Sequence, residues 1–233
     1  MRNILHVIGL MAIASVARAD ITVFSSLAAF QSATGATSAT GALPDLTGVR
    51  YSQHIGSVTF GDVNGNGFWV GGLAPMYSPS DWTTLLPGHE IAVNYMENLD
   101  VAFDAPAVYS AGFQFAEPGL ISPSSPYAHP GGYPYADSTF SVTLKLGSTV
   151  VGSFNFNAPD ETASFVGVWS DTAFNRMEIR ETSGAIEDEY FGEFYSGTVA
   201  APVPEPETYA LMLVGLGLVT LNLRRTKSNS IHS

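Results

Sequence analysis

The sequence predicts an all-β fold, an antiparallel β-sandwich of jelly-roll type, with a short helix near the N-terminus and a hydrophobic helix at the C-terminus. Between residues 20 and 201, most apolar segments alternate apolar and polar residues with a period of two. Gly, Pro, Asn or Asp interrupts this region roughly every 8 to 12 residues, which is typical of the turns of a sandwich. No segment of the region has the spacing of a long amphipathic helix.

The composition excludes several classes of protein. The chain has 233 residues, no cysteine, and 21 acidic against 9 basic residues, for a formal charge of −12. Without cysteine, disulfides, cysteine-ligated metals and thiol nucleophiles are excluded. Residues 20–201 hold 19 of the acidic residues and 4 of the basic ones, so this region carries about −15. Because nucleic acids require a cationic surface, we expect no nucleic-acid partner.

Residues 1–19 have the anatomy of a secretory signal peptide. Arg2 supplies the positive start, residues 4–16 are mainly apolar, and an Ala-Arg-Ala sequence follows. A stretch this short is unsuited to a permanent membrane span. The pattern predicts export, with cleavage between Ala19 and Asp20.

The first two elements of the mature region are a strand and a helix. Residues 21–24 are apolar or β-branched and predict the strand. Ser26 is a favourable N-cap for a helix over residues 27–33, and Gly35 is a favourable residue to end it.

Residues 58–60 and 68–73 predict two strands. The sequence Asn-Gly-Asn-Gly between them, at residues 64–67, supplies the positive φ angles of a tight turn. This spacing predicts that the two strands form a hairpin.

The remaining strands bring the expected number to about ten. Residues 139–146 alternate most regularly, and Gly147-Ser148 predicts a turn into the strand that follows. The other strands are predicted at residues 101–103, 111–115, 150–156, 165–169, 177–180 and 190–199.

A weak calcium motif overlaps the predicted turn. Asp62, Asn64 and Asn66 fit the opening of an EF-hand loop, but Leu73 stands where the loop needs its bidentate glutamate. Asn and Gly also serve a turn without any metal. The missing ligand favours the turn, and we expect no cofactor other than this calcium.

The densest acidic cluster comprises Glu187, Asp188, Glu189 and Glu193. On a strand, three of these acids share a face, which would suit paired carboxylates in glycoside hydrolysis or calcium ligands. Acids on one face also occur on solvated edge strands, where charge blocks unwanted pairing, and we favour that interpretation. The sequence has no H-E-x-x-H, G-x-S-x-G or P-loop motif, so it does not indicate catalysis.

The longest irregular segment, residues 117–137, contains five prolines and three tyrosines. Aromatic side chains on stiff loops can stack on sugar rings, and they can equally pack the loop onto the domain. The possible glycan contacts are Trp82, Tyr127, Tyr133 and Tyr135.

The C-terminus has three consecutive features. Pro204, Glu205 and Pro206 form a stiff segment, residues 209–223 are almost wholly apolar, and Arg224-Arg225 closes the span. About 15 residues at 1.5 Å each are near the lower limit for crossing a bilayer. Basic residues after the span place that end in the cytoplasm and the preceding domain outside the inner membrane.

This combination resembles the PEP-CTERM sorting signal, here at residues 202–227 with a short end at 228–233. The resemblance implies a protein exported by Gram-negative bacteria, many of which make extracellular polysaccharide. It implies cleavage near Pro204-Glu205-Pro206 by a membrane-embedded exosortase, with loss of Arg224 and Arg225. The segments at residues 25–35, 56–62 and 164–184 also resemble parts of the β-sandwich bodies that commonly carry this signal.

From these features we expect a precursor anchored in the inner membrane that becomes a cell-surface or secreted matrix protein. The expected function is non-catalytic association with extracellular polysaccharide. The alternatives are a secreted glycan hydrolase using Glu187, Glu189 and Glu193, and a purely structural or adhesive matrix protein.

Overall fold

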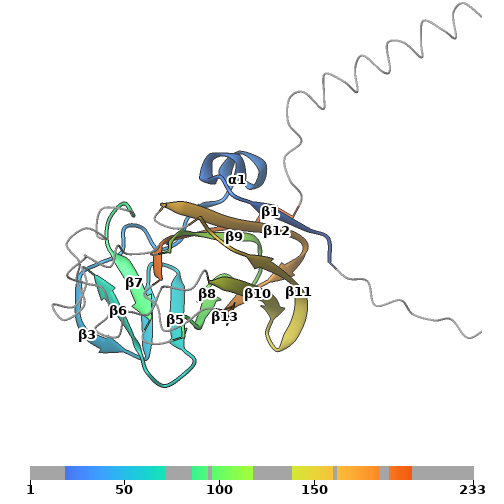
Figure 1. Ribbon diagram of the computed structural model, residues 1–233. Helices are drawn as coiled ribbons and strands as arrows, with labels where there is room; N and C mark the ends of the chain where they lie inside the picture. Colours follow the sequence, from blue (N-terminus) through green and yellow to red (C-terminus); the bar gives the residue numbers. More distant parts are fainter. Residues whose placement is uncertain are drawn as a thin grey trace, which may run out of the picture.

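The computed structural model describes residues 19–71, 86–93, 96–117, 138–159, 162–183 and 189–200. Within these ranges the chain forms two antiparallel β-sheets that lie face to face, with one short helix on the outside (Figure 1). The predicted β-sandwich with an N-terminal helix is therefore confirmed. The predicted C-terminal helix at residues 209–223 lies outside the described residues.

The larger sheet, called the first sheet, has eight strands. Its hydrogen-bonded order is β1 (Ile21–Phe24), β12 (Ser164–Phe174), β9 (Val108–Ala116), β14 (Tyr190–Gly197), β7 (Glu90–Val93), β6 (Phe68–Gly71) and β3 (Leu46–Arg50). The short strand β2 (Thr37–Ser38) pairs with the C-terminal part of β14.

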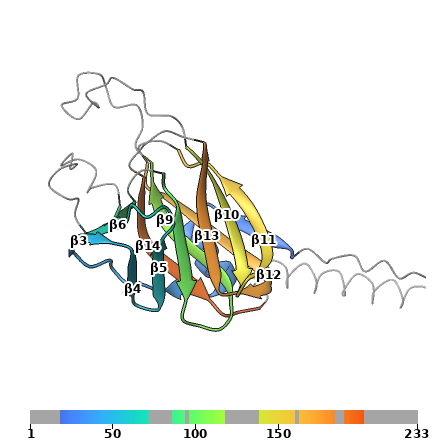
Figure 2. The same ribbon diagram turned by 90° about the horizontal axis from the view of Figure 1, so that it is seen from below.

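The second sheet has six strands and is seen from outside in Figure 2. Its order is β11 (Thr149–Phe156), β10 (Thr139–Leu146), β13 (Arg176–Ser183), β8 (Leu99–Phe103), β5 (Val58–Asp62) and β4 (Ser52–Ile55).

The core lies between the sheets and is rich in phenylalanine. The ring of Phe60 in the second sheet lies 4.9 Å from that of Phe194 in the first, and Phe115 lies 5.2 Å from Phe140, measured between centroids. Alternate residues of a strand point to opposite faces. The period of two in the sequence is therefore what sends these rings into one core.

From β7 to β14, every connection passes from one sheet to the other except the hairpin of β10 and β11. The result is the order β12-β9-β14-β7 in the first sheet and β11-β10-β13-β8 in the second. Gly147 turns the hairpin with φ 61°, which confirms the turn predicted there.

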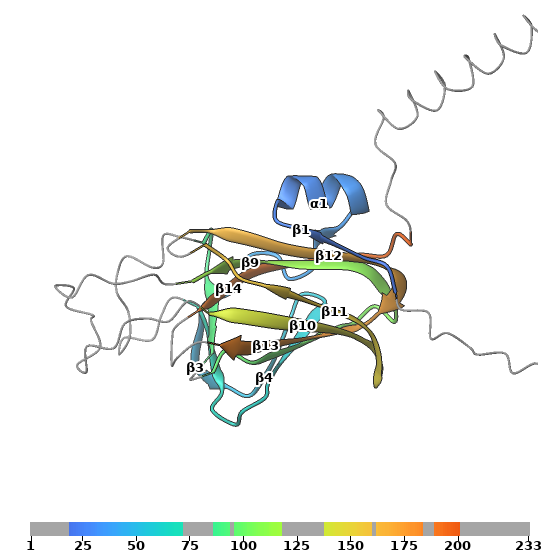
Figure 3. The same ribbon diagram turned by 45° about the vertical axis from the view of Figure 1, so that its right-hand side comes forward.

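Helix α1 (Leu27–Thr34) covers the outer face of the first sheet, above β1, β12 and β9 (Figure 3). The Ser26 hydroxyl accepts a hydrogen bond from the backbone of Ala29, and Gly35 ends the helix with φ 64°. Both capping residues were predicted from the sequence. Phe30 is fully buried and packs against Phe165 and Tyr195 of the sheet.

The prediction of a hairpin around residues 64–67 is wrong. Strand β5 pairs with β4 and β8 in the second sheet, whereas β6 pairs with β3 and β7 in the first. Gly65 and Gly67 do adopt positive φ, of 78° and 76°, but they turn the chain between the sheets. Both strands bury one apolar face, and their placement in opposite sheets lets both faces reach the same core.

The sandwich has two distinct ends. At the terminal end lie the start of β1, where Ile21 pairs with Ser170, and the end of β14, where Gly197 pairs with Ser110. At the opposite, distal end, Ser164 at the start of β12 pairs with Phe115 near the end of β9. The predicted mature N-terminus and the last described residue of the chain thus share one end.

Candidate functional site

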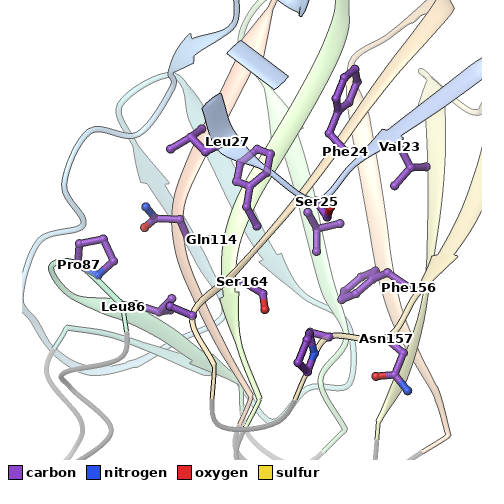
Figure 4. A pocket seen from close by; sticks show the side chains of 15 residues that line it. Val23, Phe24, Ser25, Leu27, Leu86, Pro87, Gln114, Phe156, Asn157 and Ser164 are labelled. Carbon is purple, nitrogen blue, oxygen red and sulfur yellow. The ribbon is translucent and has the colours of Figure 1, made fainter. Parts of the chain in front are cut away.

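A hollow of about 420 Å³ lies at the distal end, beside the start of helix α1. Figure 4 shows Leu86 and Gln114 on one side of it, and Phe156 and Asn157 on the opposite side. We call it the distal hollow. It is lined by Val23, Phe24, Ser25, Leu27, Leu86, Pro87, Gln114, Phe156, Asn157, Ala158, Pro159, Ala163, Ser164, Phe165 and Val166.

Packing behind the hollow holds its aromatic walls in place. Phe24 and Phe165 contact the buried ring of Phe30, at centroid distances of 5.6 and 5.2 Å. Phe156 stacks on Phe140 of the core, with a centroid distance of 5.0 Å and an interplanar angle of 11°. Because these rings rest on the core or on helix α1, the walls are preformed.

The polar groups of the hollow are neutral. Its lining contains hydroxyls of Ser25 and Ser164 and amides of Gln114 and Asn157, and none of its lining residues is charged. The Gln114 Oε1 atom accepts a hydrogen bond from the backbone N–H of Glu193, at 3.4 Å. Apolar walls with a few hydrogen-bonding groups suit an uncharged ligand that has both apolar and hydroxyl-bearing faces.

The predicted acidic cluster is only partly described, since Glu187 and Asp188 lie outside the described residues. Strand β14 is an interior strand between β9 and β7, so the solvated-edge interpretation is wrong for its acids. Glu189 is fully buried at the start of β14. The Glu193 carboxylate accepts hydrogen bonds from the hydroxyls of Ser38 and Tyr195.

The contacts of Glu193 give it a structural role. The Ser38 bond ties strand β2 to β14, and the Tyr195 hydroxyl donates to Glu193 Oε2 at 3.0 Å. Burial, followed by this hydrogen bond and the negative charge of Glu193, raises the pKa of Tyr195 to about 12. A carboxylate that already serves two hydroxyl donors is poorly placed to act as a nucleophile.

The weak calcium candidates lie at the end of β5 and in the connection from β5 to β6, where two of them, Asp62 and Asn64, form hydrogen bonds with neighbouring protein groups. Asp62 Oδ1 accepts from the backbone N–H of Asn64 at 3.2 Å. The Asn64 side-chain amide donates to the carbonyl of Met96, and its Oδ1 accepts from the side-chain amide of Asn98. Asn66 lies in the same bend. Among the described residues, no group of three or more His, Asp or Glu side chains is arranged to hold a metal ion. The geometry supports the interpretation as a turn.

A set of buried glutamates was not predicted. Glu117 Oε1 accepts from the backbone N–H of Ser138 at 2.6 Å, which joins the end of β9 to the start of β10 across the two sheets. Glu181 Oε2 accepts from the N–H of Glu97 at 3.0 Å. For Glu181 the signal in the sequence is an acid on the same face of its strand as the core residues Met177 and Ile179, whereas Glu90 lies on the face opposite the core residues Ile91 and Val93. The set comprises Glu90, Glu97, Glu117, Glu181 and Glu189.

Several predicted site residues fall outside the described part of the chain. They are Trp82, Tyr127, Tyr133 and Tyr135 for glycan contact, and Pro204, Glu205, Pro206, Arg224 and Arg225 for sorting. Ala19 and Asp20, at the predicted signal cleavage site, are described and lie at the terminal end. Within the described ranges, no helix has the length and apolar character needed to cross a membrane.

Comparison with protein families matches residues 202–225 to the PEP-CTERM protein-sorting motif. Comparisons with curated proteins and with solved structures give no match. The matched range contains the Pro-Glu-Pro sequence, the apolar segment and both arginines predicted to form a sorting signal. The chain therefore carries a PEP-CTERM sorting motif, the mark of an exported protein that is transiently membrane-anchored and processed by an exosortase-type enzyme.

Proposed function

We propose that this protein is a non-catalytic module of the cell surface or extracellular matrix that binds neutral polysaccharide through the distal hollow. The observation that carries the proposal is the lining of the hollow, which combines aromatic walls with uncharged hydroxyl and amide groups. Sugar rings present apolar faces and hydroxyl edges, so such a lining matches them. The sorting motif supports the location.

The topology agrees with this proposal. We assign the eight strands β7 to β14 to a jelly roll, because their order in the two sheets follows that architecture. Jelly rolls are common among lectin domains. Since one fold hosts many functions, the hollow and not the fold carries the argument.

Charge selects the class of polysaccharide. Three of the four basic residues between 20 and 201, namely Lys145, Arg176 and Arg180, are engaged in ion pairs with carboxylates. The region as a whole carries about −15, counted from 19 acidic and 4 basic residues. A polyanion such as a uronate polymer is repelled by this charge, and a neutral glycan is not.

The geometry of the two ends suits an anchored precursor. The chain leaves strand β14 at Gly197, at the end of the sandwich opposite the hollow. Residues 198–208 separate Gly197 from the apolar segment that begins at residue 209, and they reach at most about 40 Å when fully extended. With the terminal end near the membrane, the hollow points outward.

A blocking substitution tests the binding site. Ala163 lines the hollow and is exposed, so Ala163→Trp fills the space without disturbing the core. Val150→Trp is the matched control, because Val150 is 59% exposed near the terminal end. We expect residues 20–233, in detergent micelles, to co-sediment with cellulose and not to bind alginate. The affinity for cellulose should fall about tenfold in the Ala163→Trp variant and stay unchanged in the Val150→Trp variant.

The outcomes separate the competing functions. An equal loss of cellulose affinity in both tryptophan variants, or no loss in either, contradicts the hollow as the binding site. Retention on neither polymer favours a structural or adhesive protein. Release of reducing sugar that Glu193→Gln abolishes would favour the hydrolase alternative.

The processing step has its own test. We infer that Pro204, Glu205 and Pro206 are the recognition residues and that Arg224 and Arg225 leave with the tail. The intact mass of the secreted protein is expected to show an N-terminus at Asp20 and the loss of the residues that follow the cleavage site near Pro204-Glu205-Pro206. A secreted form that keeps both arginines contradicts the inference.

A further inference from the structure

The predicted cleavage site adjoins an acidic side chain from a distant part of the sequence. The backbone N–H of Asp20 donates to Asp171 Oδ1 at 3.1 Å. In return, the N–H of Asp171 donates to the carbonyl of Asp20 at 3.1 Å. The second bond joins the two backbones one residue beyond the pair of Ile21 and Ser170, and the first joins the Asp20 backbone to the Asp171 side chain.

The Asp171 carboxylate is held in position. The Thr172 hydroxyl donates to the same Oδ1 atom at 3.0 Å, and the Thr172 N–H donates to the Ser170 hydroxyl at 3.2 Å. Strands β1, β11 and β12 and helix α1 contain no charged residue except Asp171. The Asp20 carboxylate is the other charged group at this position.

Signal cleavage changes the chemistry of this contact. Hydrolysis of the Ala19–Asp20 peptide bond consumes one water, whose OH forms a carboxylic acid on Ala19 and whose hydrogen forms an amine on Asp20. The acid releases its proton and the amine binds one, so the products are a carboxylate and an α-ammonium with no net uptake of protons. A neutral N–H donor is thereby replaced by an α-ammonium with three donors and a positive charge. Hydrogen bonds between charged partners are shorter and stronger than those between neutral ones.

We propose that Asp171 is a receptor for the α-ammonium of the mature chain that begins at Asp20, so that signal removal tightens the attachment of strand β1. The proposal does not depend on glycan binding. It matters to the hollow, because β1 lies at the edge of the first sheet, pairs with β12 and with no other strand among the described residues, and carries Phe24 into the lining. Maturation would therefore stiffen one wall of the distal hollow.

The test compares two chain starts in two backgrounds. Residues 20–233 and residues 19–233, released from a cleavable fusion and held in detergent micelles, differ by Ala19 alone. In the native background we expect the chain that starts at Asp20 to melt about 1–3 °C higher near pH 6. In the Asp171→Asn background, which keeps the hydrogen bond but loses the charge, we expect this difference to vanish.

The pKa of the amine is a second readout that does not depend on melting. α-Amines ordinarily have pKa values near 7.7–8.0, and an ion pair raises that value. The raised pKa makes the extra stability fully present below about pH 7.7 and lost as pH rises above 8. We expect NMR titration of the chain that starts at Asp20 to give an amine pKa about 0.5 higher in the native background than in the Asp171→Asn variant. Equal melting differences in both backgrounds, or an unchanged amine pKa, would overturn the proposal.

Discussion

The outer faces of the two sheets are built on opposite principles. The first sheet lies under helix α1, and its contacts with the helix are apolar, centred on Phe30, Phe165 and Tyr195. The second sheet carries a network of ion pairs across β8, β10 and β13. The network comprises Asp100, Lys145, Arg176, Glu178 and Arg180.

Close approach governs the first face. Gly112 and Gly167 pair with each other on β9 and β12. A Cβ atom on Gly167 would lie 2.7 Å from the Phe165 ring and 2.9 Å from the Phe30 ring, and one on Gly112 would lie 2.6 Å from Phe165. The helix can therefore sit on this sheet only because the two glycines leave room for the rings.

Charge governs the second face. Lys145 lies 2.7 Å from Glu178, and Asp100 lies 2.5 Å from Arg180 and 3.3 Å from Arg176, measured between nitrogen and oxygen atoms. Burial raises the pKa of Glu178, but the hydrogen bond from Lys145 and the three positive charges outweigh it and lower the pKa. The two faces thus predict opposite responses to salt and to pH.

Removing the helix anchor is expected to have the largest effect. Phe30→Ala leaves a cavity under helix α1 and should lower the free energy of unfolding by about 3–5 kcal/mol. Because the contacts that are lost are apolar, the decrease in the free energy of unfolding should be the same in low and high salt. Urea unfolding measures both, and Gln31→Ala, an exposed change on the same helix, should cost under about 0.5 kcal/mol.

A strong salt dependence of the Phe30→Ala effect would contradict the apolar account of the first face. A loss equal to that of Gln31→Ala would contradict the packing of the helix on the sheet.

The first sheet also contains an acid on its outer side. Ile91 and Val93 point into the core, so Glu90 points outward, yet it is only 2% exposed and its Oε1 atom has no hydrogen-bond partner among the described residues. Burial raises the pKa of Glu90 to about 7. Since the folded pKa lies above the ordinary value, stability is greatest below about pH 4.5 and is lost as pH rises through 7.

Glu90→Gln is therefore expected to stabilise the protein at pH 8, by about 1–3 kcal/mol, and to change little near pH 4.5. Urea unfolding at both pH values measures the difference. Glu193→Gln is a matched control in the same sheet, whose carboxylate is hydrogen-bonded. A Glu90→Gln variant that is destabilised equally at both pH values would show that the charged form is the one the fold accommodates.

Elements with strong local signals could be predicted from the sequence. Helix α1 was predictable because Ser26 and Gly35 cap it locally, and the β10–β11 hairpin because Gly147 turns it locally. Strands β2, β3, β4 and β7 were missed, because they are short and their pairing partners are distant in sequence or the turn signals between them are weak.

The candidate site was not predictable for the same physical reason. The distal hollow combines residues near 24, 86, 114, 156 and 164, which only the alternation of strands between sheets brings together. A period of two tells which residues face inward, but it does not tell which sheet a strand joins. The hairpin predicted between β5 and β6 was wrong because both strands satisfy the period equally well in opposite sheets.

The smallest effect is expected on the face of the second sheet. Glu178→Gln removes the carboxylate that Lys145, Arg176 and Arg180 share, and should cost about 1 kcal/mol at pH 7, less in 1 M salt. Because the folded pKa of Glu178 is lowered, its contribution is present above about pH 4.5 and is lost as pH falls below that value. The sign is the reverse of that for Glu90. Unfolding curves at pH 3.5 and 7, with and without salt, measure the loss of unfolding free energy in Glu178→Gln. A loss that is as large at pH 3.5 as at pH 7 would mean that Glu178 acts by packing instead of charge.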